Sequence, residues 1–416
     1  MHRRWAIFAI TSFNFFLSQF YRSSNAVIAP QLLQDLGLDT AGLGLMSAAF
    51  FYAFAFTQIP LSMLLDRIGP RRMMTGLSLL GITGALIFAW SNSLNQGIIG
   101  RSLLGIGMAC NLMGTFKLLT LWFPSGSFAT LSGAVFSIGF IGNIAATTPL
   151  VFLVQRLGWR MAFTSIAGIN FILVIMLFCV VRDKPYQGSG HEDAPGSVPE
   201  TPRVLPNMKL LLKNRDYWII SLGTFVGYGS FAAFQTLWAG PYLIEVMGFS
   251  PFHAGNLLLI VNLGLIIGSP MWGAMTDRVF KTRKWIILPG LFLSAATMLA
   301  ITMINPGTAI LLLATLFFLF GLVRASNLLM YAHIKELMPL DMAGAAMTGI
   351  NFFTMMGPAV YLQGLGLFMQ SLYPHASRGP AAFNAAFVLC TVTLILASLL
   401  YFVAKDTKRP GTLRKV

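Results

Sequence analysis

Five basic residues lie inside apolar stretches of the sequence, where charged side chains are rare. They are Arg22, Arg101, Lys117, Arg324 and Lys335. The thirteen acidic residues lie at or beyond the ends of these stretches, so no carboxylate is placed to neutralise the bases. A charged residue in apolar surroundings is costly without a counter-charge, and it usually marks a functional site. This distribution predicts a buried, positively charged site that binds an anion.

Two of these bases have polar neighbours that could line a cavity. Arg22 directly follows Tyr21 in the segment YRSSN, and Arg324 shares its apolar stretch with Asn327 and Tyr331. On a helix, Asn327 falls one turn after Arg324 and shares its face. We expect Arg22 and Arg324 to bind the anion from two separate parts of the chain. The alternative for Arg324 is a structural bond to backbone carbonyls at a helix break.

The remaining bases lie nearer the ends of their stretches. We expect Arg101 and Lys117, which share one stretch, to assist the two central arginines. Each could instead extend its head group to a surface, Arg101 on the outer side and Lys117 on the inner side. Lys335 lies beside an acid, Glu336, near the end of a stretch, which favours an ion pair at the interface. His333 is expected to be a packed polar residue rather than a proton relay.

The stretches that carry these residues are long and numerous. Hydrophobic residues make up 56% of the chain and charged residues 10%, against roughly 25% charged residues in soluble domains. Mean hydropathy is +0.73. Runs of about 20 apolar residues can cross a bilayer as helices, whereas the alternating pattern of a membrane barrel is not seen. We count twelve such stretches, near 5–29, 42–65, 73–91, 95–122, 128–155, 159–182, 216–246, 253–277, 285–304, 308–337, 343–371 and 381–404.

One long hydrophilic segment divides the chain. It covers residues 183–215, contains GSGHEDAPGSVPETP and has the composition of a flexible linker. The sequence therefore predicts an all-α membrane protein with a six-helix bundle over 1–182, a linker, a second six-helix bundle over 216–404 and a tail over 405–416.

The basic residues also indicate orientation. With the N-terminus in the cytoplasm, twenty Lys and Arg residues fall in cytoplasmic segments, and three, Arg156, Arg160 and Arg378, fall on the opposite side. This positive-inside bias puts both termini and the linker in the cytoplasm. It also explains most of the net charge of +15, so no nucleic-acid partner is expected.

The sequence shows no pattern typical of disulfide bonds, metal binding or catalysis. Cys110, Cys179 and Cys390 all lie within apolar stretches, which favours neither disulfides nor a metal site. No nucleophile with a matching base is evident, so we expect neither an enzyme nor a cofactor.

A charged turn follows the second stretch and has a counterpart in the second half. The first runs LLDRIGPRR, with Asp66, Arg67 and Arg71, and the second runs GAMTDRVFKTRK, with Asp277 and Arg278. An acid at a helix C-terminus is unfavourable for the helix dipole and needs a cation nearby. Repetition between halves is typical of transporters whose site lies at the interface of the halves.

The first turn resembles the G-x-L-x-D-R-x-G-x-R-R/K signature of the major facilitator superfamily, with Ser62 in place of the first glycine. The resemblance covers the whole chain and implies two pseudo-symmetric bundles of six helices. It also implies a cytoplasmic gate that includes Asp66, Arg67, Arg71, Asp277 and Arg278. The alternative is that these charges only fix the topology.

Two further segments are similar to the anion:cation symporter branch of that superfamily. One is the Tyr-Arg pattern at Arg22, followed by Pro30, and the other contains Arg101 and Lys117 before the sequence WFP. In that branch the corresponding arginines bind a substrate carboxylate. A Glu that serves proton coupling there is Met108 here, so facilitated transport, exchange and proton symport all remain open. The segment from Gly133 to Pro149 lacks the Gly-Pro pair found in drug antiporters of the superfamily, which argues against that class of transporter.

These observations predict an inner-membrane transporter of a small organic anion, a carboxylate, that works by alternating access. Tyr21, Asn327 and Tyr331 are expected to join the basic residues in the site. The partners expected are the anion, a proton or counter-anion as coupling ion, and the bilayer, with the protein a monomer. The alternatives are an exporter of a larger amphipathic or zwitterionic compound and a membrane sensor that transports nothing.

Overall fold

The computed structural model describes residues 2–124, 127–183, 211–305, 307, 309–338 and 340–407. Within these ranges, the side chains of some residues lie outside the description: His2, Ser62, Met63, Asp66, Phe128, Ala129, Asp277, 340–345 and Thr348. Most of the predicted linker, 184–210, and most of the predicted tail, 408–416, also lie outside the described residues.

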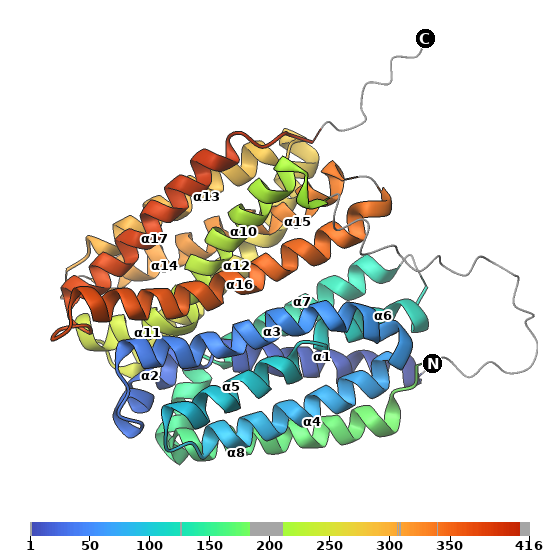
Figure 1. Ribbon diagram of the computed structural model, residues 1–416, viewed down its shortest axis with the longest axis horizontal. Helices are drawn as coiled ribbons and strands as arrows, with labels where there is room; N and C mark the ends of the chain where they lie inside the picture. Colours follow the sequence, from blue (N-terminus) through green and yellow to red (C-terminus); the bar gives the residue numbers. More distant parts are fainter. Residues whose placement is uncertain are drawn as a thin grey trace, which may run out of the picture.

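Every regular element in the described part of the chain is a helix (Figure 1). The first half contains α1 (His2–Ser23), α2 (Asn25–Asp35), α3 (Thr40–Ile68), α4 (Pro70–Ala89), α5 (Leu94–Met108), α6 (Asn111–Trp122), α7 (Phe128–Ala145) and α8 (Thr148–Val180). The second half contains α10 (Arg215–Ala233), α11 (Ala239–Pro241), α12 (Pro251–Ala274), α13 (Lys284–Thr302), α14 (Ile310–Arg324), α15 (Leu329–Leu337), α16 (Leu340–Leu372) and α17 (Pro380–Tyr401).

Short irregular turns join several of these helices into longer spans. Phe234–Trp238, Tyr242–Val246 and Met275–Phe280 are π-helical, and Ala325–Leu328 is a 3₁₀ turn between α14 and α15. In α8 the backbone breaks at Gly158, where φ is 75°. A positive φ is readily adopted only by glycine. This break separates the end of the fifth span from the start of the sixth.

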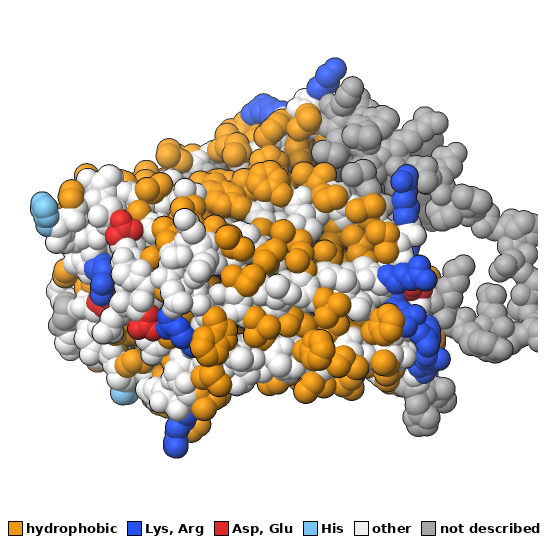
Figure 2. All heavy atoms as spheres, turned by 60° about the horizontal axis from the view of Figure 1, so that its bottom comes forward, with side chains coloured by type: hydrophobic (Ala, Val, Ile, Leu, Met, Phe, Trp, Pro, Cys, Tyr) orange, Lys and Arg blue, Asp and Glu red, His pale blue; other side chains and the backbone are white. Residues whose placement is uncertain are grey.

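The helices account for the predicted membrane crossings. Ten segments of the described residues are long and apolar enough to span a bilayer. Helices α1 and α2 together form one further crossing, although α1 is rich in polar residues. Helix α7, continued to the break at Gly158, forms another. Apolar side chains cover the flank of the bundle that Figure 2 shows. Phe171, Ile172 and Leu396 are among the large apolar residues that are exposed. The prediction of an all-helical membrane protein with two six-helix bundles is confirmed.

The two halves pack against each other along α3 and α16. Figure 1 shows the blue and green helices of the first half below the yellow to red helices of the second. Gly44 lies against the carbonyl of Leu362, and Gly366 lies against the carbonyl of Thr40, with no room at either glycine for a Cβ atom. Small residues of this kind let helix backbones approach closely within a membrane.

Charged residues gather at the two ends of the bundle (Figure 2). One end, which we call the basic end, carries exposed basic side chains: Arg67, Arg72, Arg182, Arg278 and Lys281. Helix α1 begins there, and α17 ends there beside the start of α10, where the Lys405 amide donates to Asp216. The other end, the mixed-charge end, holds two ion pairs of 2.6 Å, Arg160–Asp35 and Arg378–Glu245.

The described hydrogen bonds between the two halves lie at mid-depth in the bundle and toward the mixed-charge end. Thr40 donates to Gln370 over 3.0 Å, Tyr52 donates to Gln363 over 2.9 Å, and Thr148 donates to Asn256 over 2.6 Å. At the basic end, the described polar contacts of Arg71 and Arg283 stay within one half. The described hydrogen bonds between the halves therefore lie away from the termini.

Candidate binding site

Arg22 lies at the C-terminus of α1, where a turn at Ser24 separates α1 from α2. A cation is favourable at this end of a helix because of the helix dipole. The Arg22 side chain is only 7% exposed, and its guanidinium lies 4.9 Å from the ring centroid of Phe54 and 5.9 Å from that of Phe51. Its Nε atom has no hydrogen-bond partner among the described residues. The nearest polar contact is long, 3.5 Å from Nη1 to the hydroxyl of Tyr228.

Arg324 is the corresponding cation of the second half. It is the last residue of α14, directly before the 3₁₀ turn, and is 6% exposed. Its guanidinium lies 5.7 Å from the ring centroid of Phe231 and against Gly227, where a Cβ atom would come within 3.1 Å of Nη1. Nε and Nη1 have no hydrogen-bond partner among the described residues. The predicted helix break exists, but these two nitrogens bond no carbonyl there.

Helix α10 lies beside both arginines. Tyr228 belongs to this helix of the second half, yet its hydroxyl contacts Arg22 of the first half. The preceding residue of the same helix, Gly227, lies against Nη1 of Arg324. Helix α10 therefore contacts a cation from each half.

The other predicted residues of the second half lie at the edge of this site. The Tyr331 hydroxyl is 3.0 Å from both Asn351 Oδ1 and the Thr354 hydroxyl, which fix its position. Asn327 is buried, with Nδ2 unpaired among the described residues. It lies near Gly290 of α13, so its side chain is directed toward α13.

Arg101 is buried inside the first half. It has no exposed surface, and its Nη1 donates to the backbone carbonyl of Tyr21 over 2.9 Å. Its guanidinium lies 5.0 Å from the ring centroid of Phe50 and 5.6 Å from that of Phe88. The expected alternative, extension to the outer surface, is not what the structure has. Arg101 instead holds the peptide that precedes Arg22, and the Tyr21 side chain is fully buried beside it.

Lys117 is remote from Arg101. It is partly buried on α6, and at 1.5 Å of rise per residue it lies about 24 Å farther along the span. A small anion cannot contact both. The structure thus brings Arg22 and Arg324 against α10, keeps Arg101 and Tyr21 directly behind Arg22, and puts Lys117 nearer the basic end. Tyr331 is bonded to Asn351 and Thr354 of α16.

The predicted gate residues of the first half lie at the turn between α3 and α4, where Gly69 has a φ of 87°. The side chain of Asp66 lies outside the described residues, and Arg67 is exposed. Arg71 donates its backbone N–H to Asp183 over 2.7 Å and its guanidinium to the Phe178 carbonyl over 2.7 and 3.0 Å. This turn is therefore anchored to the end of α8.

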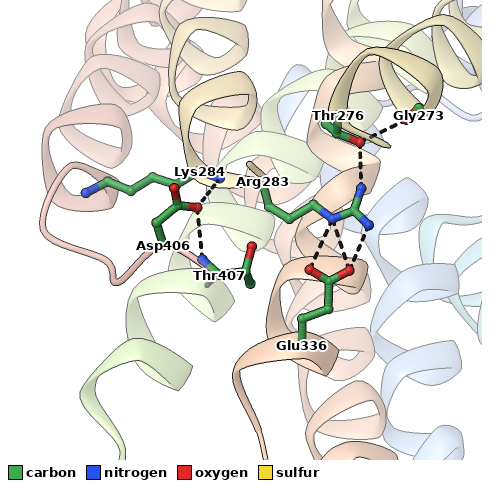
Figure 3. A network of polar contacts seen from close by, with 7 residues as sticks. All are labelled: Gly273, Thr276, Arg283, Lys284, Glu336, Asp406 and Thr407. Carbon is green, nitrogen blue, oxygen red and sulfur yellow. Dashed lines mark hydrogen bonds and ion pairs between the residues drawn. The ribbon is translucent and has the colours of Figure 1, made fainter. Parts of the chain in front are cut away.

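The corresponding turn of the second half uses a residue that sequence reasoning missed. The Asp277 side chain lies outside the described residues and Arg278 is exposed, but Arg283 donates to Glu336 over 2.7 Å and also to Thr276 (Figure 3). Glu336 therefore pairs with Arg283. Asp406 accepts from the backbone N–H groups of Lys284 and Thr407 (Figure 3).

His333 is packed, as expected. It is fully buried, with one ring nitrogen against the Tyr401 hydroxyl and the other 2.9 Å from the Lys405 carbonyl. No cluster of three metal-binding side chains occurs among the described residues.

Tyr228 is the main site residue that the sequence analysis missed. Its signal is visible in retrospect: it stands between Gly227 and Gly229 in an apolar helix. Gly227 admits Arg324, and Gly229 packs against Gly357 of α16. Because neither glycine has a side chain, α10 packs closely against Arg324 and α16 on either side of Tyr228.

Comparisons with known proteins agree with this architecture. The family model described as Major Facilitator Superfamily matches residues 11–261 and 220–415. The chain is 24% identical to a probable sulfoacetate transporter of Cupriavidus necator, over 86% of each chain. It is 24% identical to a probable galactarate/D-glucarate transporter of Escherichia coli, over 97% of this chain and 94% of the other. It is also 24% identical to a D-galactonate transporter of Escherichia coli, over 94% and 93%.

Solved structures share the fold. A bacterial homolog of the human lysosomal transporter Spinster, in an inward-facing and unoccupied conformation, superposes with a TM-score of 0.77 at 17% identity, over 97% of each chain. A D-xylose-proton symporter superposes with a TM-score of 0.72 at 14% identity, over 94% of this chain and 97% of the other.

Proposed function

The chain belongs to the Major Facilitator Superfamily, and from this membership and the central cations we propose that it carries a small organic anion, a carboxylate, across the bacterial inner membrane. Its relatives are membrane transporters rather than enzymes. Their names include sulfoacetate, galactarate, D-glucarate and D-galactonate, all organic anions, which supports the substrate class.

The observation that carries the proposal is the pair of buried guanidinium groups. Arg22 and Arg324 come from opposite halves, each is more than nine-tenths buried, and each keeps N–H groups unpaired among the described residues. A buried cation without a counter-ion is unfavourable, whereas a guanidinium binds a carboxylate through paired, charge-assisted hydrogen bonds. A substrate anion supplies the missing partner.

The proposed transport mechanism is alternating access. In transporters with this fold the halves rock around a site near the midplane. The described hydrogen bonds join the halves at mid-depth and toward the mixed-charge end, which supports entry and exit at the basic end in this state. The basic end is proposed to face the cytoplasm because of its excess of Lys and Arg.

The surrounding residues take supporting roles in this proposal. Arg101 fixes the peptide before Arg22, Tyr21 packs behind it, and Tyr331 lines the second-half side. Asn327, with its side chain toward α13, stands behind Arg324. Lys117 would attract the anion toward the site from the basic end. We further propose two bundles over residues 1–182 and 216–404, a monomeric protein, and a proton or counter-anion as the coupling ion.

The gate proposal covers the turns at the basic end. Asp66, Arg67 and Arg71 in the first half, with Asp277 and Arg278 in the second, would hold that end closed in the opposite state. The anchoring of Arg71 to α8 supports a rigid turn that moves with its own half.

A ligand screen followed by uptake tests the proposed function. The purified protein is heated with mono- and dicarboxylates, sugar acids, phosphates and amino acids, because a ligand that binds only the folded state raises the unfolding temperature. Uptake of each stabilising anion is then measured in proteoliposomes with Arg22→Ala, Arg324→Ala and the exposed control Arg156→Ala. We expect loss of uptake in the first two and wild-type rates in the control. Wild-type rates in all three would refute the two-cation site, and stabilisation by amphipathic cations alone would favour the exporter.

A further inference from the structure

We propose that this site selects an anion with two negative charges, one held by Arg22 and one by Arg324. The inference rests on the proposed function, and it adds the charge of the substrate. The relatives leave this charge undecided, since galactarate is a dicarboxylate and galactonate is a monocarboxylate.

The first argument is the charge balance at the centre of the bundle. Toward the basic end, the described carboxylates are already engaged: Asp183 by the Arg71 amide, Asp216 by the Lys405 amide, Asp406 by the Lys284 and Thr407 amides, and Glu336 by Arg283. Asp35 and Glu245 form ion pairs at the mixed-charge end.

The backbone positions of Asp66 and Asp277 lie at the basic end as well. Within the described residues, no carboxylate faces the two central arginines. A monoanion would leave either Arg22 or Arg324 without a counter-charge, whereas a dianion can pair with both.

The second argument is the separation of the two guanidinium groups. Helix α10 contacts both cations, Arg22 through the Tyr228 hydroxyl and Arg324 through Gly227. The two guanidinium groups thus meet different residues of this helix. Each cation is left with its own acceptor site, one at Arg22 and one at Arg324.

The third argument is the orientation of the free donors. Each guanidinium lies over an aromatic ring, Arg22 over Phe54 and Arg324 over Phe231. A guanidinium carries its N–H donors in its own plane, so they can still bind an acceptor. Nε of Arg22 and both Nε and Nη1 of Arg324 are unpaired among the described residues. The planar fork of a guanidinium matches a carboxylate through two parallel hydrogen bonds. The site therefore presents one guanidinium group on each half, and each keeps at least one N–H group unpaired among the described residues.

The experiment compares anions that differ only in charge. Each α,ω-dicarboxylate from malonate to adipate is paired with its own monoamide, and both dissociation constants are measured at pH 7.5 with the full-length protein in detergent. The best dicarboxylate is expected to bind at least tenfold more tightly than its monoamide. In Arg22→Gln and in Arg324→Gln this ratio is expected to fall to within about twofold, because one cation remains.

Charge-preserving variants separate this effect from a folding defect. Arg22→Lys and Arg324→Lys are expected to bind more weakly than wild type but to keep a dicarboxylate-to-monoamide ratio of at least fivefold. Equal binding of acid and monoamide by the wild type, with both lost in the Gln variants, would overturn the two-charge inference and leave the proposed function standing. If no carboxylate of either kind binds or is transported, both proposals fail.

Discussion

Arg283 and Arg324 are both buried arginines of the second half, but their surroundings differ in kind. Arg283, which is 9% exposed, has a carboxylate partner in Glu336 and a hydroxyl partner in Thr276. Arg324, which is 6% exposed, has no described carboxylate beside it, and two of its nitrogens are unpaired among the described residues. The fold thus supplies hydrogen-bond partners to the buried Arg283, whereas Arg324 keeps two nitrogens without such partners among the described residues. The difference fits a structural role for Arg283 and the proposed binding role for Arg324.

The first half offers a weaker contrast at closer range. Arg101 and Arg22 meet at one helix break, where Arg101 donates Nη1 to the Tyr21 carbonyl over 2.9 Å and the neighbouring Arg22 makes only a 3.5 Å contact to Tyr228. Nε is unpaired among the described residues in both, so the two arginines differ in the strength of one contact.

The largest effect is expected when the unpartnered charge is removed. Arg324→Gln should lower kcat/KM for the transported anion by at least 100-fold, because it removes a charge-assisted contact with the substrate. The same change should leave the ligand-free unfolding temperature equal or higher, since an uncompensated buried cation disappears. Uptake in proteoliposomes and thermal unfolding measure the two quantities. A clear drop in unfolding temperature would show that Arg324 has a structural partner after all.

A smaller effect on transport is expected at Arg101. Arg101→Gln removes the donor to the Tyr21 carbonyl and lets the peptide before Arg22 shift, so transport should fall about tenfold by loss of orientation. Because Arg101 supplies no charge to the substrate, the ratio of dicarboxylate to monoamide affinity should stay at its wild-type value. Competition binding with the two ligands measures that ratio. Its collapse in this variant would place Arg101 in direct contact with the anion.

The fold was largely predictable because membrane insertion imposes strong constraints on sequence. Apolar length, the divided Lys and Arg distribution and the repeated Asp-Arg turn were enough to predict two bundles of six helices. Local breaks were less visible. The stretches predicted at 128–155 and 159–182 are separated only by Gly158, and α14 passes into a 3₁₀ turn at Ala325, where no proline marks the change.

The candidate site was predictable only in part. Arg22 and Arg324 could be predicted because a basic residue in an apolar stretch, without an acid nearby, is energetically unfavourable and is visible in the sequence. Arg101 has the same signature, yet its bond to the Tyr21 carbonyl depends on how α5 packs against the α1 break. Tyr228 was missed because an aromatic residue in an apolar helix usually packs in a core, and only the packing of α10 against Arg324 reveals its position.

The paired arginine should behave in the opposite way to Arg324. Arg283→Gln leaves Glu336 without its partner and should lower the free energy of unfolding by about 1–2 kcal/mol, a value reduced because Glu336 is partly exposed. The apparent affinity of the remaining folded protein for its substrate should be unchanged. Thermal unfolding and equilibrium binding test this prediction, with Glu336→Gln as the matched change. Weaker substrate binding without loss of stability would reverse the assignment.

The smallest effect is expected at the mixed-charge end, at a pair exposed to water. The Trp159 indole N–H, 2.8 Å from Asp35 Oδ2, and then the Arg160 guanidinium hold the pKa of Asp35 below its usual value of 3.8. A carboxyl whose pKa is lower in the folded state stabilises the fold above pH 3.8, and this contribution is lost as the pH falls from there through the folded-state pKa. The contribution should be below about 1 kcal/mol because the pair is solvated. In thermal unfolding between pH 3 and 7, Asp35→Asn should be less stable than wild type at neutral pH, and the difference should shrink toward pH 3. A difference that stays constant over this range would mean that the amide loses packing rather than charge.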